Sequence, residues 1–91
     1  MPLSTSAKRT VTLTNPAGLH ARPSAAIAEA VRRFQSKVQI CNGNRVVDAA
    51  SILELLTLGA PQGSSLVLTA KGPDAEQALD AVVQELSKHY E

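Results

Sequence analysis

The chain has 91 residues, a formal net charge of +1 and an apolar fraction of 44%. This length suits one domain with one core, and the composition is that of a globular chain rather than a disordered one. The near-neutral charge excludes nucleic-acid binding by bulk electrostatics, and one Tyr and one Phe without Trp argue against base stacking. The single Cys41 excludes an intrachain disulfide and a cysteine-based zinc site.

No apolar run approaches the roughly 18 residues that a membrane-spanning helix needs. Residues 1–7 also lack the apolar stretch of a signal peptide. We therefore expect a soluble, cytoplasmic protein without a membrane partner. We expect one domain over residues 1–91, with an ordered core over about 7–89.

The first third of the chain predicts a strand, a break and a helix. Residues 8–14 are rich in β-branched side chains and place Val11 and Leu13 on one face, which is typical of a strand. The Asn-Pro-Ala-Gly sequence at 15–18 ends it. Over 21–34 the apolar residues recur at spacings of three and four, as on one face of an amphipathic helix; they are Ile27, Ala30, Val31 and Phe34.

The rest of the chain predicts three strands and two helices. Asn42-Gly43 between the strand-like runs 37–42 and 45–48 is a strong hairpin signal. The remaining expected elements are a short helix over 51–58, a strand over 66–71 and a helix over 74–88, with Asp74 and Gln77 as a capped start. The order βαββαβα predicts an α+β fold, with three helices on one face of a four-stranded, mainly antiparallel sheet.

The segment 18–24, Gly-Leu-His-Ala-Arg-Pro-Ser, joins the first strand to the first helix. Pro23 fits a first helical turn, so His20 should lie at or next to the N-cap. The amides of Ala21 and Arg22 and the positive end of the helix dipole then meet beside the imidazole, which makes an anion site. The same field favours the neutral, nucleophilic imidazole, and the Arg22 guanidinium suits phosphate oxygens. The residues alone leave open a second interpretation, in which His20 is a cap or a solvated side chain.

Three segments carry a resemblance to a known family. Residues 18–23 closely match the active-site motif of HPr, the histidine-containing phosphocarrier of the bacterial sugar phosphotransferase system. Residues 48–53, followed by 56–59, look like the segment around that family's regulatory serine. Residues 72–79 look like its last strand-to-helix join. The segments stand in the family's order and spacing, and the resemblance covers about residues 7–89.

The resemblance implies an open-faced β-sandwich that carries a phosphoryl group and is not an enzyme. By position, Nδ1 of His20 receives the group from phosphorylated enzyme I, which phosphoenolpyruvate has charged, and passes it to a sugar-specific enzyme IIA. Arg22 is implied as the phosphate partner. Ile52, Leu53 and Leu56 resemble the surface on which these partners dock, and we expect at least one of Ile52 and Leu53 to be exposed. No metal or cofactor is implied, and we expect a monomer.

Ser51 has two interpretations. With Glu54 it forms the pattern of a capping box, which is a sufficient structural reason for the serine. In many members of the family a dedicated kinase, the HPr kinase/phosphorylase, modifies the equivalent serine, so Ser51 is also the candidate for regulatory phosphorylation. Ala50 and Glu54 depart from the regulated pattern, and a carboxylate that reaches back to cap would repel a phosphate.

Two other functions compete with the sugar-system carrier. A paralogous carrier in a nitrogen-type or regulatory phosphorelay would keep both His20 and Arg22. An HPr-like regulatory binding module would carry no phosphate, although such regulators lack the histidine that this chain keeps. An enzyme acting on a small molecule is disfavoured, because the sequence shows no second acid or base motif, glycine-rich phosphate loop or metal-ligand cluster.

Overall fold

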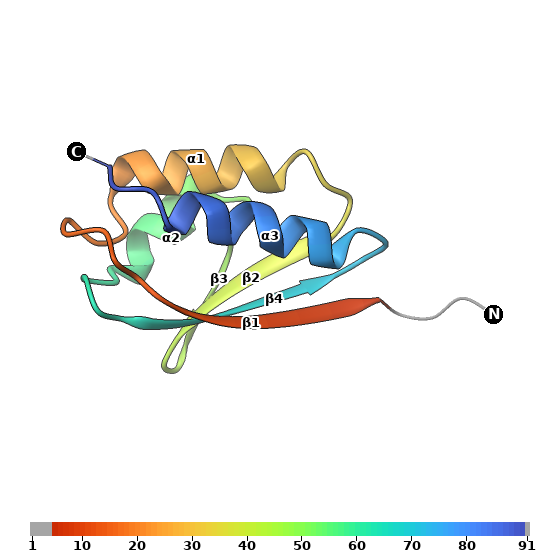
Figure 1. The fold of residues 1–91 in the computed structure, drawn as a ribbon, viewed down its shortest axis with the longest axis horizontal. Helices are drawn as coiled ribbons and strands as arrows, with labels where there is room; N and C mark the ends of the chain where they lie inside the picture. Colours follow the sequence, from red (N-terminus) through yellow and green to blue (C-terminus); the bar gives the residue numbers. More distant parts are fainter. Residues whose placement is uncertain (1–4, 91) are drawn as a thin grey trace.

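The computed structural model describes residues 5–90, in which four strands form one antiparallel sheet with three helices on one side (Figure 1). The sheet order is β1-β4-β2-β3, and the strands are β1 (Ser6–Thr12), β2 (Lys37–Asn42), β3 (Arg45–Asp48) and β4 (Ser65–Lys71). The helices are α1 (Ala21–Val31), α2 (Ile52–Leu58) and α3 (Ala75–Leu86). This confirms the βαββαβα order and the open-faced sandwich, and every neighbouring strand pair is antiparallel.

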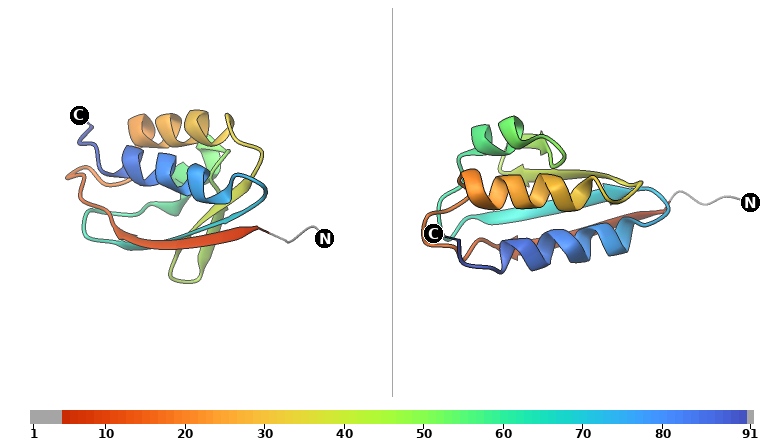
Figure 2. Two further views of the ribbon diagram at one scale, coloured as in Figure 1. Left: turned by 45° about the vertical axis from the view of Figure 1, so that its right-hand side comes forward. Right: turned by 90° about the horizontal axis from the view of Figure 1, so that it is seen from above.

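The core lies between the sheet and the helices. Alternate residues of the two central strands point into it, and Val38, Ile40, Leu66 and Leu68 are fully buried. Seen from above, α1 lies between α2 and α3 and packs against both (Figure 2). Within the part of the chain that the structure describes, the other face of the sheet carries no helix, so one row of each strand's side chains faces the solvent.

The element boundaries agree with the sequence to within a few residues. The first strand spans Ser6–Thr12 rather than 8–14. Leu13 still bonds to the segment just before β4, because its N–H donates to the Ser64 carbonyl at 2.9 Å. Helix α1 ends at Val31 rather than at Phe34. The amides of Arg33 and Phe34 donate to the carbonyls three residues earlier instead of four. The α-helical hydrogen-bond pattern therefore ends before these residues.

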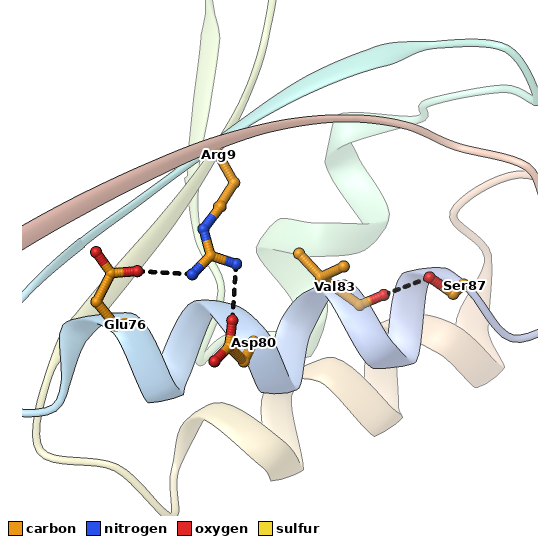
Figure 3. Close-up of polar contacts among 5 residues, drawn as sticks. All are labelled: Arg9, Glu76, Asp80, Val83 and Ser87. Atoms are coloured by element: carbon orange, nitrogen blue, oxygen red, sulfur yellow. Dashed lines mark hydrogen bonds and ion pairs between the residues drawn. The ribbon is translucent and has the colours of Figure 1, made fainter.

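Arg9 joins the edge strand β1 to α3 (Figure 3). Its guanidinium donates to the Glu76 carboxylate at 2.6 Å and to the Asp80 carboxylate at 2.7 Å, both on one face of α3. At the end of the same helix, the Ser87 hydroxyl donates to the Val83 carbonyl at 2.8 Å. The fork orients α3 on the sheet, although half-exposed ion pairs of this kind add little to stability.

The predicted capped start of α3 was wrong in its chemistry. Asp74 is the N-cap residue, but its side chain makes no cap hydrogen bond. Its carboxylate instead accepts from the Gln35 amide at 3.0 Å and from the Ser36 amide at 2.9 Å, as well as from the Ser36 hydroxyl. These bonds, that from the Ser36 hydroxyl first, lower the pKa of Asp74. Asp74 therefore anchors the connection from α1 to β2.

Within residues 5–90, no helix is both long enough and apolar enough to cross a membrane.

Candidate functional site at the start of helix α1

The turn before α1 fixes the path by which the chain enters the helix. Gly18 has φ +70°, and a Cβ at this position would lie 2.5 Å from the Ala60 carbonyl oxygen. Only glycine therefore fits here. The next residue, Leu19, is buried, and its amide donates to that same carbonyl at 2.9 Å. The backbone just before His20 is thus fixed by the turn at Gly18 and by the buried Leu19.

Asn15 is a buried hub beneath this turn, 1% exposed. Its Nδ2 donates to the Gly18 carbonyl at 3.0 Å, and its Oδ1 accepts from the Tyr90 amide at 3.0 Å. The end of the described chain therefore lies beside the entry to α1 (Figure 1). Sequence reasoning treated 15–18 only as a strand break. The turn signal was present in the sequence, but no local pattern predicts a contact between residues 75 positions apart.

Tyr90 is half-buried next to the site. Its hydroxyl donates to the Glu85 carboxylate. Burial and then this hydrogen bond raise the pKa of Tyr90 to about 12, while the positive charge of Arg22 acts in the opposite direction. The exposed Arg22 therefore lies close enough for its charge to be felt at the end of the chain.

His20 is the N-cap residue of α1, as expected, with an extended backbone (φ −101°, ψ −165°) and no side-chain cap hydrogen bond. The residue is half-buried, and the buried ring nitrogen is Nε2, which has no hydrogen-bond partner. Nδ1 is not among the buried unpartnered side-chain atoms of residues 5–90, so we infer that a reactant would approach the ring from the edge that carries Nδ1. The imidazole is neither sealed into the core nor locked by a neighbour.

Ser24, one turn into the helix, is the site residue to which sequence reasoning gave no role. It is fully buried, and its Oγ has no hydrogen-bond partner. A buried polar atom without a partner costs about 1–3 kcal/mol and calls for an explanation. Its amide donates to the His20 carbonyl at 3.0 Å, so the two residues are linked through the first turn.

The start of α1 combines a nucleophile with an anion site. The first turn carries no acidic residue, and the amides of Ala21 and Arg22 are the first of the helix. The positive end of the helix dipole and the exposed Arg22 guanidinium add to the same field. An incoming phosphoryl oxygen would meet these groups beside Nδ1 of His20. Within residues 5–90, no group of His, Cys, Asp or Glu is arranged to hold a metal ion.

Helix α2 runs antiparallel to α1. Ala60, just after α2, accepts from Leu19 beside His20, whereas Ala50, just before α2, accepts from Arg32 at the end of α1. Figure 2 shows α2 lying alongside α1. The structure therefore places Ser51 near the far end of α1 and does not bring it together with His20.

The predicted docking residues divide by exposure. Ile52 is half-buried and packs on the core, while Leu53 is 76% exposed and Leu56 is 39% exposed. The expectation that Ile52 or Leu53 is at the surface is confirmed by Leu53. Exposed leucines one turn apart give α2 an apolar outer face on the side of the molecule that also carries α1.

The capping box at α2 is only half formed. The Ser51 hydroxyl accepts from the Glu54 amide at 3.2 Å, as expected for an N-cap serine. The Glu54 carboxylate does not return to Ser51; it accepts from the Asp48 amide at 3.0 Å. The expected reciprocal bond was therefore wrong, because the Ser51 amide is already used by the Asp48 carbonyl at 3.1 Å.

Comparison with known proteins identifies the family. The family model described as "PTS HPr component phosphorylation site" matches residues 7–88. The chain belongs to the HPr family. It is 39% identical over 83 residues to the phosphocarrier protein HPr of Treponema pallidum, covering 91% of this chain and 94% of that protein. The phosphocarrier protein NPr of Shewanella violacea is 40% identical over 78 residues, covering 86% of each chain.

A solved HPr structure supports the same assignment. The crystal structure of HPr from Bacillus anthracis has a TM-score of 0.83 and 31% identity, covering 88% of this chain and 95% of that one. The match extends over the sheet and the helices, so the fold described above is that of the HPr family. The family model describes a phosphorylation site of a phosphotransferase-system component, and the relatives named above are phosphocarrier proteins, which are carriers rather than catalysts.

Proposed function

We propose that this chain accepts a phosphoryl group on Nδ1 of His20 from phosphorylated enzyme I and passes it to an enzyme IIA. Phosphoenolpyruvate is the original donor. One observation carries the proposal: a half-exposed histidine, open at its Nδ1 edge, stands at the uncapped start of α1. We further propose that residues 1–91 act as a single domain, as a monomer and in the cytoplasm.

The site suits phosphoryl transfer because that reaction depends mainly on position and charge. The buried Leu19 and Pro23 hold the backbone on either side of His20. The helix N-terminus and Arg22 stabilise charge on the oxygens of the moving group, and Ala21 and Arg22 supply the first backbone amides. No acid or base beyond the imidazole is needed, which fits a carrier that donates the group to another protein.

The direct test is labelling with phosphoenolpyruvate and a cognate enzyme I. We expect one acid-labile, base-stable phosphate per chain, with two-dimensional NMR locating it on Nδ1 of His20. The chain offers a matched control in its other histidine, the exposed His89, and His89→Ala should label as the wild type does. A label on any residue other than His20 would overturn the proposal.

Arg22→Ala should slow transfer roughly ten- to a hundredfold, because a charge-assisted contact to the phosphoryl oxygens is lost. The side chain is exposed, so the fold should be retained. Arg22→Lys keeps the positive charge but loses the planar guanidinium fork, so its transfer rate should lie between those of the wild type and of Arg22→Ala. Stopped-flow transfer rates test this, and an unchanged rate in Arg22→Ala would remove this residue from the mechanism.

Ile52, Leu53 and Leu56 are proposed as the docking patch for enzyme I and enzyme IIA. Leu53→Glu should raise the KM for this chain as a substrate of enzyme I by about tenfold, because it places a charge in an apolar contact. Leu53 is exposed, so its substitution should not change the melting temperature. Val46→Glu is the matched control, since Val46 is 53% exposed on the sheet face away from the helices. Equal KM values for the two variants would rule out the patch.

Ser51 is proposed as the site at which an HPr kinase/phosphorylase could regulate the carrier. Its hydroxyl is already the N-cap of α2, and Glu54 lies in the same first turn, where its charge would oppose a phosphate. Mass spectrometry after incubation with ATP and the kinase decides the matter. A phosphate on Ser51 supports regulation, and an unmodified chain leaves the serine as a cap.

A nitrogen-type or regulatory phosphorelay is the second candidate, and the similarity to an NPr favours it. Such a carrier would use the same His20 and Arg22, so the site cannot separate the two. The two candidates can be separated by comparing how fast a sugar-type and a nitrogen-type enzyme I label the chain at equal concentrations. A binding module without carrier activity would not label with either.

A further inference from the structure

Two polar atoms in the first turn of α1 are unexplained by the fold. His20 Nε2 and Ser24 Oγ are the buried side-chain nitrogen and oxygen atoms within residues 5–90 that have no hydrogen-bond partner. They belong to residues four positions apart, which lie next to each other on a helix face. Buried polar atoms of native proteins are nearly always paired, so two unpaired atoms in the same turn point to a shared purpose.

Ser24 is placed to reach toward His20. Side chains of a helix tilt toward its N-terminus, so the Ser24 Cβ is directed back along α1 toward the N-cap. A helical serine commonly bonds its hydroxyl to the carbonyl four residues earlier, but here the His20 carbonyl accepts only the Ser24 amide, at 3.0 Å. The hydroxyl is therefore available, and a rotation about Cα–Cβ redirects it without moving the backbone.

We propose that Ser24 is a positioning residue for the phosphoryl transfer at His20, accepting a hydrogen bond from Nε2–H once its hydroxyl rotates toward the ring, before the phosphoryl group arrives. The inference rests on the proposed carrier function. It adds a partner for the nitrogen that does not react. Holding the proton on Nε2 selects the tautomer in which Nδ1 has its lone pair ready, and it prevents Nε2 from being the nucleophile.

The electron balance of the step shows why that proton matters. The Nδ1 lone pair forms the new bond to phosphorus, while the bond from phosphorus to the donor breaks and its electrons stay with the donor. The ring of His20 then carries a positive charge and keeps its Nε2 proton, and a hydroxyl oxygen that accepts a hydrogen bond from Nε2–H stabilises the charge. On onward transfer the electron pair returns to Nδ1, with Nε2 still protonated.

The test is Ser24→Ala, with two readouts. Nitrogen-15 NMR of the unphosphorylated protein at slightly alkaline pH should show mainly Nε2–H in the wild type and a shift toward the Nδ1–H tautomer in the variant. Phosphorylation by enzyme I should be about three- to tenfold slower, the loss expected for one hydrogen bond. The melting temperature should hold or rise, because alanine fits the site and removes an unpaired hydroxyl.

A purely structural serine would behave differently, and the chain offers a matched control. Ser36 is also a buried serine, but it lies beyond the other end of α1 and donates to Asp74. Ser36→Ala should lower the melting temperature and leave both the tautomer and the rate unchanged. An unchanged tautomer balance or an unchanged rate in Ser24→Ala overturns the inference. If the wild type does not label at all, the proposed function fails, while the tautomer measurement still tests Ser24.

Discussion

Helices α1 and α2 begin in opposite ways within one small chain. At α2 the N-cap Ser51 accepts the Glu54 amide, and an acidic residue stands in the first turn. At α1 the N-cap His20 makes no such bond, and the first turn has no acidic residue. The positive end of α2 is therefore satisfied by its own side chains, whereas that of α1 is left for an anion.

The third helical residue explains much of this difference. At α2 that residue is Glu54, whose amide is the donor that a cap uses. At α1 it is Pro23, which has no N–H, so a side chain at position 20 has no such donor to accept from. A proline that is harmless to the helix thus keeps the N-cap side chain available for chemistry. From this single choice the same fold builds one capped helix start and one open helix start.

Removing the His20 side chain should separate function from stability most sharply. His20→Ala should reduce labelling by enzyme I at least a hundredfold, because the proposed phosphoryl acceptor is gone. Its free energy of unfolding should change by less than about 1 kcal/mol, since the ring makes no hydrogen bond to lose. Labelling assays and urea titration measure the two quantities. A variant that still labels, or one that unfolds, would show that the start of α1 is not the functional one.

Ser51→Ala should have the opposite effect to His20→Ala: it should lower stability and leave labelling almost unchanged. Loss of the cap bond to Glu54 should lower the free energy of unfolding by about 1 kcal/mol. Labelling by enzyme I should stay within about twofold of the wild type, because Ser51 lies away from His20 at the opposite end of the helix pair. Ser51→Thr keeps a capping hydroxyl and serves as the control. A variant as stable as the wild type would mean that the capped start contributes nothing.

The sequence predicts the features that depend on local chemistry. Asn42-Gly43 placed the hairpin between β2 and β3, and Pro23 placed the start of α1, both at the observed residues. Gly59, with φ +60°, is the C-cap of α2, which ends at Leu58 as the expected helix over 51–58 does. The motif around His20 was enough to locate the candidate site, because its parts lie within a single turn of chain.

Contacts between distant segments were beyond local patterns. The Asn15 side chain joins Gly18 to Tyr90, and nothing near either residue indicates that pairing. Ser24 carried no signal as a polar residue, since its significance depends on being fully buried without a partner. At Asp74 a local pattern was present but predicted the wrong hydrogen bonds. Its position before a helix predicted a cap, but a neighbouring connection supplied better donors.

The start of α3, at Asp74, gives the smallest expected effect on stability, and that effect depends on pH. Hydrogen bonds from Ser36 and Gln35 lower the pKa of Asp74 from the reference value of 3.8. A carboxyl whose pKa is lower in the folded state stabilises the protein above its unfolded pKa. That contribution is lost as the pH falls through the folded value. Asp74→Asn should therefore lower the melting temperature by a few degrees at neutral pH, and the gap should close below about pH 4.

Circular dichroism melts from pH 7 to pH 2 test this expectation. Gln77→Ala is the control, because Gln77 is the exposed residue that the expected capping pattern paired with Asp74. Its effect should be small and the same at every pH. A gap between wild type and Asp74→Asn that persists unchanged into acid would mean that the carboxylate charge does not hold the connection from α1 to β2. The start of α3 would then resemble neither the capped start of α2 nor the open start of α1.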